Sequence, residues 1–127
     1  MSLSLSDSLV EHSALTTRQL DALQLYVSVV RREMKYREAA VVAARGRTRG
    51  AARPLTVGSF FRTVQQAREN VKKSVVTLLI GIWLGVVKVD DVRRLLDVAG
   101  GGARELSVEE RARLAGVLRE LVERIVI

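Results

Sequence analysis

The chain has 127 residues, 48% of them hydrophobic, which predicts a single domain with a substantial core. It has no cysteine, so it can form no disulfide and has no cysteine nucleophile. With a single histidine, His12, it also lacks the cysteine and histidine ligands of a typical metal site, and the sequence implies no cofactor. No signal sequence opens the chain, and its longest uncharged run, residues 74–87, is shorter than the roughly 20 residues that span a bilayer, so we expect a cytoplasmic protein without membrane contact.

The net charge of +7 is concentrated in the middle of the sequence. Residues 1–30 hold one basic and three acidic residues, residues 31–73 hold twelve and three, and residues 74–127 hold eight of each, so the middle segment carries +9. Such a segment attracts polyanions because neutralised phosphates release their counterions. Aromatic residues make up only 4% of the chain, too few for the stacking platforms of single-strand binders, so double-stranded nucleic acid is the favoured partner.

Residues 1–14 show no strong periodicity, and we expect a loose, flexible arm there. A helix is predicted to begin after this arm, because Leu15, Thr16 and Gln19 provide a hydrophobic staple, an N-cap and a capping-box partner. The helix should end near Arg32. Its inner stripe is predicted to be Leu20, Leu23, Val27 and Val30.

A second helix is predicted over residues 36–45, with Gly46 capping its end. Its small residues predict close packing; they are Ala39, Ala40, Ala43 and Ala44. Residues 46–54 include two glycines and a proline, which predicts a turn or a flexible loop. Basic side chains in or beside this segment can reach phosphates, although a solvated connector explains the same composition; they are Arg45, Arg47, Arg49 and Arg53.

The segment of residues 54–85 is predicted to form one long helix, or two that join near Gly81. Thr56 stands at the N-cap position, and apolar residues then recur at helical spacing. The opposite side of the first half presents hydrogen-bonding and positively charged groups: Ser59, Arg62, Gln66, Asn70 and Lys73. This is the chemistry of a helix that reads a DNA groove, and the competing interpretation is an ordinary solvated helix face.

Short stretches of these three helices resemble a known DNA-binding motif. They are Leu15–Gln19 with Ala22–Tyr26, Tyr36–Ala40 and Thr56–Ser59. Together they look like the helix-turn-helix of sigma-factor carboxy-terminal regions, LuxR-type regulators and archaeal Tfx-type regulators. The resemblance covers residues 15–73 and implies that the helix beginning at Thr56 enters the major groove, with Thr56, Ser59 and Arg62 facing the DNA.

Residues 74–87 are apolar around most of a helix, so they require cover on several sides. One chain of this length has few elements to provide that cover. We therefore expect a homodimer whose interface includes Leu79, Ile82 and Trp83, with Trp83 as its anchor. The alternative is that this stretch is a central core helix enclosed within one chain.

Two further helices are predicted in the C-terminal region. The first begins at residues 89–91 with Val92, Leu95 and Leu96 facing inward, and the glycine run 100–102 ends it. The second begins at Ser107, with Glu110 as its capping-box partner. Its stripe is assigned to a core within the subunit or across the dimer interface, and consists of Leu114, Leu118, Leu121 and Ile125.

The sequence indicates no enzyme. Adjacent carboxylates such as Asp90 and Asp91 stand at helix starts, where they complement the dipole, and no set of serine, histidine and aspartate offers a catalytic geometry. We predict an all-α helix-turn-helix protein with an arm (1–14), a DNA-binding region (15–73) and a dimerisation region (74–127). It would bind double-stranded DNA as a nucleoid-associated transcriptional regulator, with no indicated operator or effector. Alternatives are a sequence-indifferent architectural or RNA-binding protein and a helical adaptor for an acidic protein.

Overall fold

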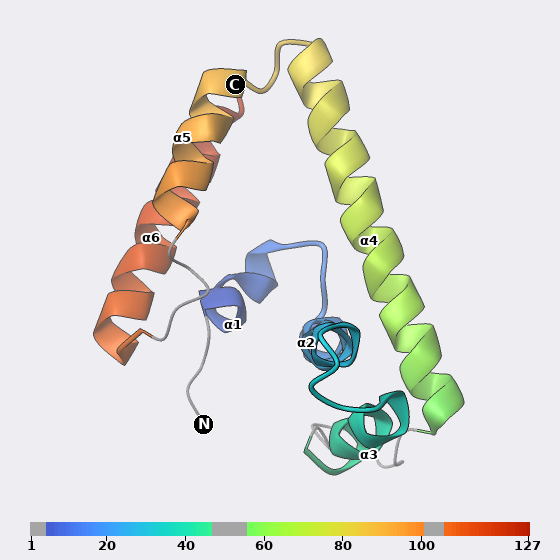
Figure 1. The fold of residues 1–127 in the computed structure, drawn as a ribbon. Helices are drawn as coiled ribbons and strands as arrows, with labels where there is room; N and C mark the ends of the chain where they lie inside the picture. Colours follow the sequence, from blue (N-terminus) through green and yellow to red (C-terminus); the bar gives the residue numbers. More distant parts are fainter. Residues whose placement is uncertain (1–4, 47–55, 101–105) are drawn as a thin grey trace. The chain divides into compact units, whose positions relative to one another are not determined.

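The computed structural model of the protein describes residues 5–46, 56–100 and 106–127 (Figure 1). The described residues form helices joined by turns, and the all-α class is confirmed. The elements are α1 (Leu5–Leu9), the 3-10 turn η1 (Val10–His12), α2 (Thr17–Val30), α3 (Tyr36–Gly46), α4 (Val57–Trp83), α5 (Val89–Ala99) and α6 (Val108–Ile125). Among these helices, none is long and apolar enough to cross a membrane.

The chain divides into two compact units. The central unit is Ser13–Lys72, with α2, α3 and the first half of α4. The terminal unit is Met1–His12 with Lys73–Ile127, and it contains the rest of α4 together with α1, α5 and α6. Helix α4 is continuous through Lys72 and Lys73, so it belongs to both units.

Helix α2 begins with the capping box that the sequence predicts. The Thr16 hydroxyl accepts a hydrogen bond from the Gln19 amide at 3.1 Å, and the Thr16 amide donates to Oε1 of Gln19 at 3.1 Å. At its other end Arg32 takes a left-handed conformation with φ of 62°, and the amide of Glu33 donates to the Ser28 carbonyl. This is a Schellman ending built on a residue other than glycine, and it ends the helix where the charge pattern indicated.

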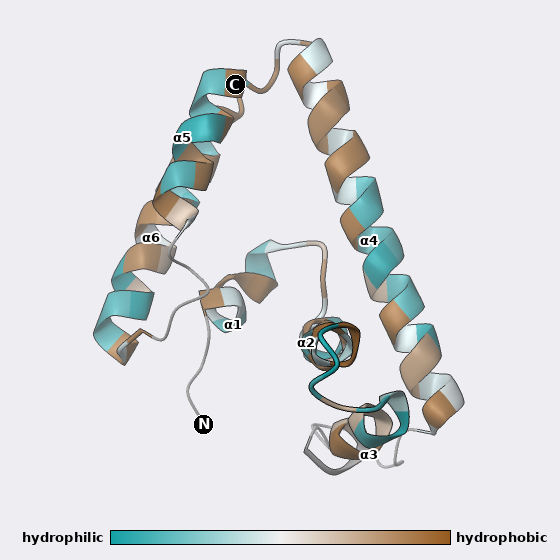
Figure 2. Ribbon diagram, in the orientation of Figure 1, coloured by the Kyte–Doolittle hydropathy of each residue, from teal (hydrophilic) through white to brown (hydrophobic). Residues whose placement is uncertain are grey.

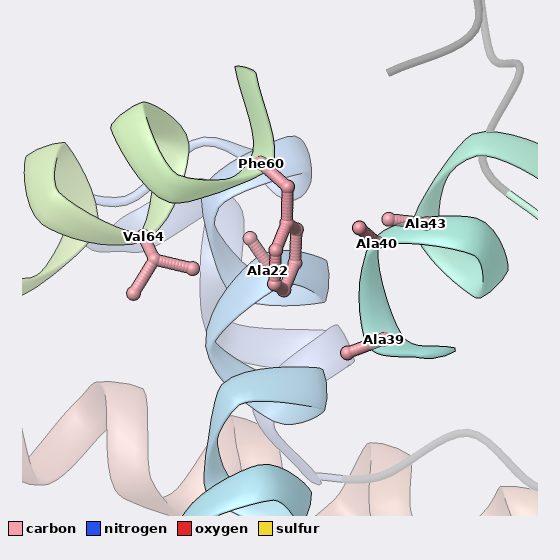
Figure 3. Close-up of a cluster of buried hydrophobic side chains, with 6 residues drawn as sticks. All are labelled: Ala22, Ala39, Ala40, Ala43, Phe60 and Val64. Atoms are coloured by element: carbon pink, nitrogen blue, oxygen red, sulfur yellow. The ribbon is translucent and has the colours of Figure 1, made fainter. Parts of the chain in front are cut away.

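The core of the central unit forms where small residues of α2 and α3 meet the aromatic ring of Phe60 (Figure 3). Its buried members are Ala22, Ala39, Ala40, Ala43, Phe60 and Val64. The close packing predicted for the α3 alanines is confirmed, since three of them are buried. Tyr36 meets Phe60 edge to face, with ring centroids 5.3 Å apart. Burial, and secondarily Tyr26, raise the pKa of the Tyr36 phenol.

The predicted inner stripe of α2 is partly wrong. Leu20 is buried, but Val27 and Val30 are exposed. The core instead receives Leu25, Tyr26 and Val29, which pack around the buried Ala22. The reason is steric, because the small side chain of Ala22 lets neighbouring backbones approach there, and the buried side of α2 is centred on that residue.

Helix α4 is a single helix of 27 residues without a break at Gly81. It starts as predicted, with the Thr56 hydroxyl accepting from the Ser59 amide at 3.0 Å. Gly85, with φ of +78°, ends it, and the amides of Gly85 and Val86 donate to the carbonyls of Ile82 and Gly81. A Cβ at Gly81 would lie 2.9 Å from Cγ2 of Val87, so this glycine is required for the close packing of the following turn.

The terminal unit has its own small core, in which α1 and α5 pack on α6. Leu5, Ala115 and Leu118 are its buried members, and Leu9, Leu95 and Leu114 are among the side chains against it. We expected a loose arm at the N-terminus, but residues 5–12 are helical because Leu5 and Leu9 find partners on α6. The prediction that Leu96 faces inward is wrong, since this residue of α5 is 63% exposed while Leu95 packs against the core.

The end of the chain packs on the turn between α4 and α5. The amide of Ile127 donates to the Val86 carbonyl at 3.1 Å, and Val87 forms an antiparallel bridge with Val126. Helix α6 itself starts at the predicted cap, where the Ser107 hydroxyl accepts from the Glu110 amide at 3.1 Å. Val87 and Ile125 are buried, so both ends of this contact are anchored by apolar side chains.

Candidate nucleic-acid interface

A polar groove lies on the central unit, between the start of α2 and the first half of α4. Its volume is about 460 Å³. We call it the α2–α4 groove, and it is lined by Thr16, Arg18, Gln19, Ser59, Arg62, Thr63 and Gln66. All seven lining residues are polar or basic and none is acidic, so the groove has a net positive charge.

Two arginines dominate the electrostatics of this groove. Arg18 and Arg62 are both exposed, and within the described residues neither side chain forms an ion pair or hydrogen bond. Arg18 is also in the first turn of α2, where the helix dipole contributes further positive potential. Unpaired guanidinium groups in an open polar groove suit the oxygens of phosphates or the acceptor edges of bases.

The hydroxyls and amides of the groove divide into structural and available groups. Thr16 caps α2, and the Thr63 hydroxyl donates to the Ser59 carbonyl at 3.0 Å within α4. The side chains of Ser59 and Gln66 have no such role within the described residues, and Gln66 is exposed. Ser59, Arg62 and Gln66 therefore present free donors and acceptors along one side of α4.

The other basic residues of α4 in the central unit are already engaged. The Arg68 guanidinium lies over the Tyr26 ring, 5.6 Å from its centroid. Lys72 pairs with Glu69 at 3.3 Å, one turn earlier on the same helix. Among the described cations of this half of α4, Arg62 is thus the one available to a ligand in the groove.

Asn70, predicted to face DNA, connects α4 to α2. Its Nδ2 donates to Oε1 of Gln19 at 3.0 Å and to the Ala14 carbonyl at 3.3 Å. Gln19 is itself part of the α2 capping box, so one amide group joins the start of α2 to α4 across 51 residues of sequence. Both protons of the Asn70 amide are used inside the unit.

Replacement of Asn70 by alanine is expected to lower the free energy of unfolding by about 1–2 kcal/mol, because it removes a part-buried hydrogen bond to Gln19 and an exposed one to the Ala14 carbonyl. Urea denaturation followed by circular dichroism measures the change. Gln66→Ala, one turn earlier and exposed, is the matched control and should stay within about 0.5 kcal/mol of the wild type. Equal losses in the two variants would contradict the structural role of Asn70.

The structure gathers part of the predicted DNA-binding set. Ser59, Arg62 and Gln66 line one groove. Thr56 is exposed at the start of α4 with its hydroxyl used as the cap, and Lys73 is exposed where the terminal unit begins. Arg47, Arg49 and Arg53, and the side chain of Arg45 on α3, lie outside the described residues.

The groove also includes residues that the sequence analysis did not assign to binding. Arg18 is the most important of them, with Thr16, Gln19 and Thr63 beside it. The sequence placed Arg18 in the first turn of a helix, but no local signal showed that this turn lies beside α4. That neighbourhood depends on contacts such as the one between Asn70 and Gln19.

The predicted dimer residues fall into two groups. Leu79 and Trp83 are exposed and Ile82 is half-buried. Leu118 and Ile125 of α6 are buried within the single chain, and Leu121 is half-buried. The α6 stripe therefore packs within one subunit, which is one of the two arrangements that the sequence allows.

Within the described parts of the chain, no three residues of the types that bind metals are grouped so that they could hold an ion. Comparisons of the chain with protein-family models, with curated proteins and with solved structures find no match.

Proposed function

We propose that the protein binds double-stranded DNA through the α2–α4 groove and acts as a transcriptional regulator. The observation that carries the proposal is the pair of unpaired arginines, Arg18 and Arg62, in one groove with the polar side of α4. Arg62 and Gln66 have the side-chain types that make two hydrogen bonds to guanine and adenine, respectively, in the major groove. Arg62 and Gln66 also belong to the segment of residues 31–73, which carries a net charge of +9 in the sequence.

The groove suggests a division of labour between the two helices. Arg18, at the positive end of α2, would contact a phosphate and set the position of the unit on the duplex. Ser59, Arg62 and Gln66 extend over two turns of α4, about 10 Å, which is roughly the rise of three base pairs. These residues would approach base edges, in the manner of a helix-turn-helix recognition helix.

Two other functions are compatible with a basic helical surface. A sequence-indifferent architectural or RNA-binding protein would use the same arginines for phosphates without base preference. A helical adaptor would bind an acidic protein instead of nucleic acid. The available Gln66 and Ser59 beside the arginines favour base contact, because these neutral groups add little to purely electrostatic binding.

The affinity for a duplex is expected to fall about 10³-fold between 50 and 200 mM salt, because about six basic side chains per chain would neutralise phosphates. Fluorescence anisotropy with a duplex, across a salt series, measures it. A selection of bound sites from random duplexes then separates the classes. Enrichment of a common site supports the regulator, and binding without enrichment supports an architectural protein. An affinity that is flat with salt would contradict the nucleic-acid proposal.

A further inference from the structure

One side chain of the α2–α4 groove, the carboxamide of Gln19, is held in a single orientation by its neighbours. Gln19 lines the groove and is half-buried. Its Oε1 accepts two hydrogen bonds, from the Thr16 amide at 3.1 Å and from Nδ2 of Asn70 at 3.0 Å. Asn70 belongs to the middle of α4, which Figure 2 shows as mostly hydrophilic. Both lone pairs of the Gln19 oxygen are therefore used inside the central unit.

Backbone groups at the two ends of this network determine how each carboxamide is oriented. Nδ2 of Asn70 also lies 3.3 Å from the Ala14 carbonyl, which can only accept, so the nitrogen of Asn70 must face it. The Thr16 amide can only donate, so the atom of Gln19 that faces it must be the oxygen. Reversing either carboxamide would place donors against donors or acceptors against acceptors. The amino group of Gln19, Nε2, is consequently the end of the side chain left for a ligand.

This amino group is accessible and can only donate. Among the described residues, Nε2 of Gln19 makes no hydrogen bond, and it is not a buried atom. Arg18 precedes Gln19 in the same turn of α2, and both line the groove. The carboxamide of Gln66, on the α4 side of the groove, can turn to donate or to accept, whereas that of Gln19 offers donors alone. A fixed donor of this kind selects an acceptor such as a phosphate oxygen.

We propose that Gln19 contacts the DNA backbone, its amino group donating to a phosphate oxygen beside Arg18, with Asn70 as the positioning residue. The inference rests on the proposed function, which assigns Arg18 to a phosphate and gives Gln19 no role. A phosphate is favoured over a base edge because Gln19 lies in the first turn of α2, where the helix dipole attracts anions. The donor is preorganised, since a side chain that is already immobilised loses little further freedom on binding.

The fixed orientation of Gln19 is tested without nucleic acid, by NMR relaxation of the side-chain amides. The amino group of Gln19 is expected to be rigid and that of Gln66 mobile. Asn70→Ala should give the Gln19 amino group the mobility of Gln66. Val29→Ala is the control, because it weakens packing on the core in the last turn of α2, and it should leave Gln19 rigid. Equal mobility of the two glutamines in the wild type overturns the proposal.

Gln19→Glu tests the donor, because glutamate keeps an acceptor for Thr16 and Asn70 but replaces the amino group by a charged oxygen. Affinity for a duplex is expected to fall about 10–30-fold near 100 mM salt, with helical circular dichroism unchanged. Thr17→Glu is the matched control, since it adds the same charge at an exposed site in the first turn of α2 that does not line the groove. It should lose less than about threefold. Equal losses in the two variants overturn the proposal.

Asn70→Ala separates positioning from charge, because it leaves the net charge unchanged. Its affinity for a duplex should fall about threefold, the cost of immobilising one side chain on binding, while Val29→Ala should bind like the wild type. The loss should be equal for duplexes of unrelated sequence, since phosphates carry no base information. In the Gln19→Glu background Asn70→Ala should have no further effect, because the donor that it positions is gone. Losses that multiply, or that depend on base sequence, overturn the assignment of Gln19 to a phosphate.

Failure of this proposal can be distinguished from failure of the proposed function. If the wild type binds no duplex, the proposed function is wrong, and the phosphate contact of Gln19 is wrong with it, whatever the NMR result. If duplexes bind and Gln19→Glu binds as tightly as Thr17→Glu, only the role of Gln19 is wrong.

Discussion

Replacement of Phe60 by alanine is expected to lower the free energy of unfolding of the central unit by about 3–5 kcal/mol. The Phe60 side chain is 0% exposed and is the largest fully buried residue of that unit. It fills the space between Ala22 of α2 and the alanines of α3, whose short side chains cannot close the cavity that the substitution would leave. The loss is a large fraction of the roughly 5–15 kcal/mol that stabilises a typical domain.

Phe61 provides a matched control for this experiment. It is the next residue on α4, it has the same side chain, and it is 50% exposed, so Phe61→Ala should cost about 1 kcal/mol or less. Urea denaturation of both variants, followed by circular dichroism, gives the comparison. If Phe61→Ala were the more destabilising change, α4 would be rotated by about 100° relative to the core, and the assignment of its polar side would be wrong as well.

Reversal of both groove charges, Arg18→Glu with Arg62→Glu, is expected to reduce affinity for a DNA duplex by about 10²–10³-fold near 100 mM salt. The double variant removes two cations that the proposal places on phosphates or base edges, and it adds two carboxylates that repel the phosphate backbone. Since both side chains are exposed and unpaired within the described residues, the fold should tolerate the change. Fluorescence anisotropy measures the affinity, and circular dichroism verifies the fold.

The control variant makes the same change in net charge on a helix outside the groove. Arg113→Glu with Arg119→Glu reverses two exposed arginines of α6 in the terminal unit. This variant should lose less than about tenfold in affinity, because it acts only through the long-range field of the whole protein. Equal losses for the two double variants would show that binding follows total charge, and the groove would then have no special role.

The starts of the helices could be read from the sequence because they depend on neighbouring residues. The caps at Thr16, Thr56 and Ser107 each act over three residues, from a side-chain hydroxyl to an amide in the first turn. The alanines of α3 were also recognisable, since small residues on one side of a helix favour close packing whatever the partner is. The all-α class follows from signals of this kind.

The buried side of each helix was harder to predict. On α2 the stripe from Leu20 to Val30 competes with one centred on Ala22, and both have helical spacing. On α5, Leu95 and Leu96 are adjacent and equally hydrophobic, so hydrophobicity alone does not show which of the two faces the core. The residues 5–12 carried too weak a period to predict a helix, because α1 is short and is stabilised by its packing on α6.

By itself, the sequence determined where α2, α4 and α6 begin, which segment concentrates the positive charge and which side of α4 is polar, because these properties depend on residues only a few positions apart. The tertiary structure alone decided that Arg18 and Arg62 share a groove and that Asn70 connects α4 to the capping box of α2. It also decided that Phe60 of α4 is buried while Leu79 on the same helix is exposed. Such features depend on how segments some 50 residues apart pack together, which is set by side-chain shape across the whole core and leaves no local pattern.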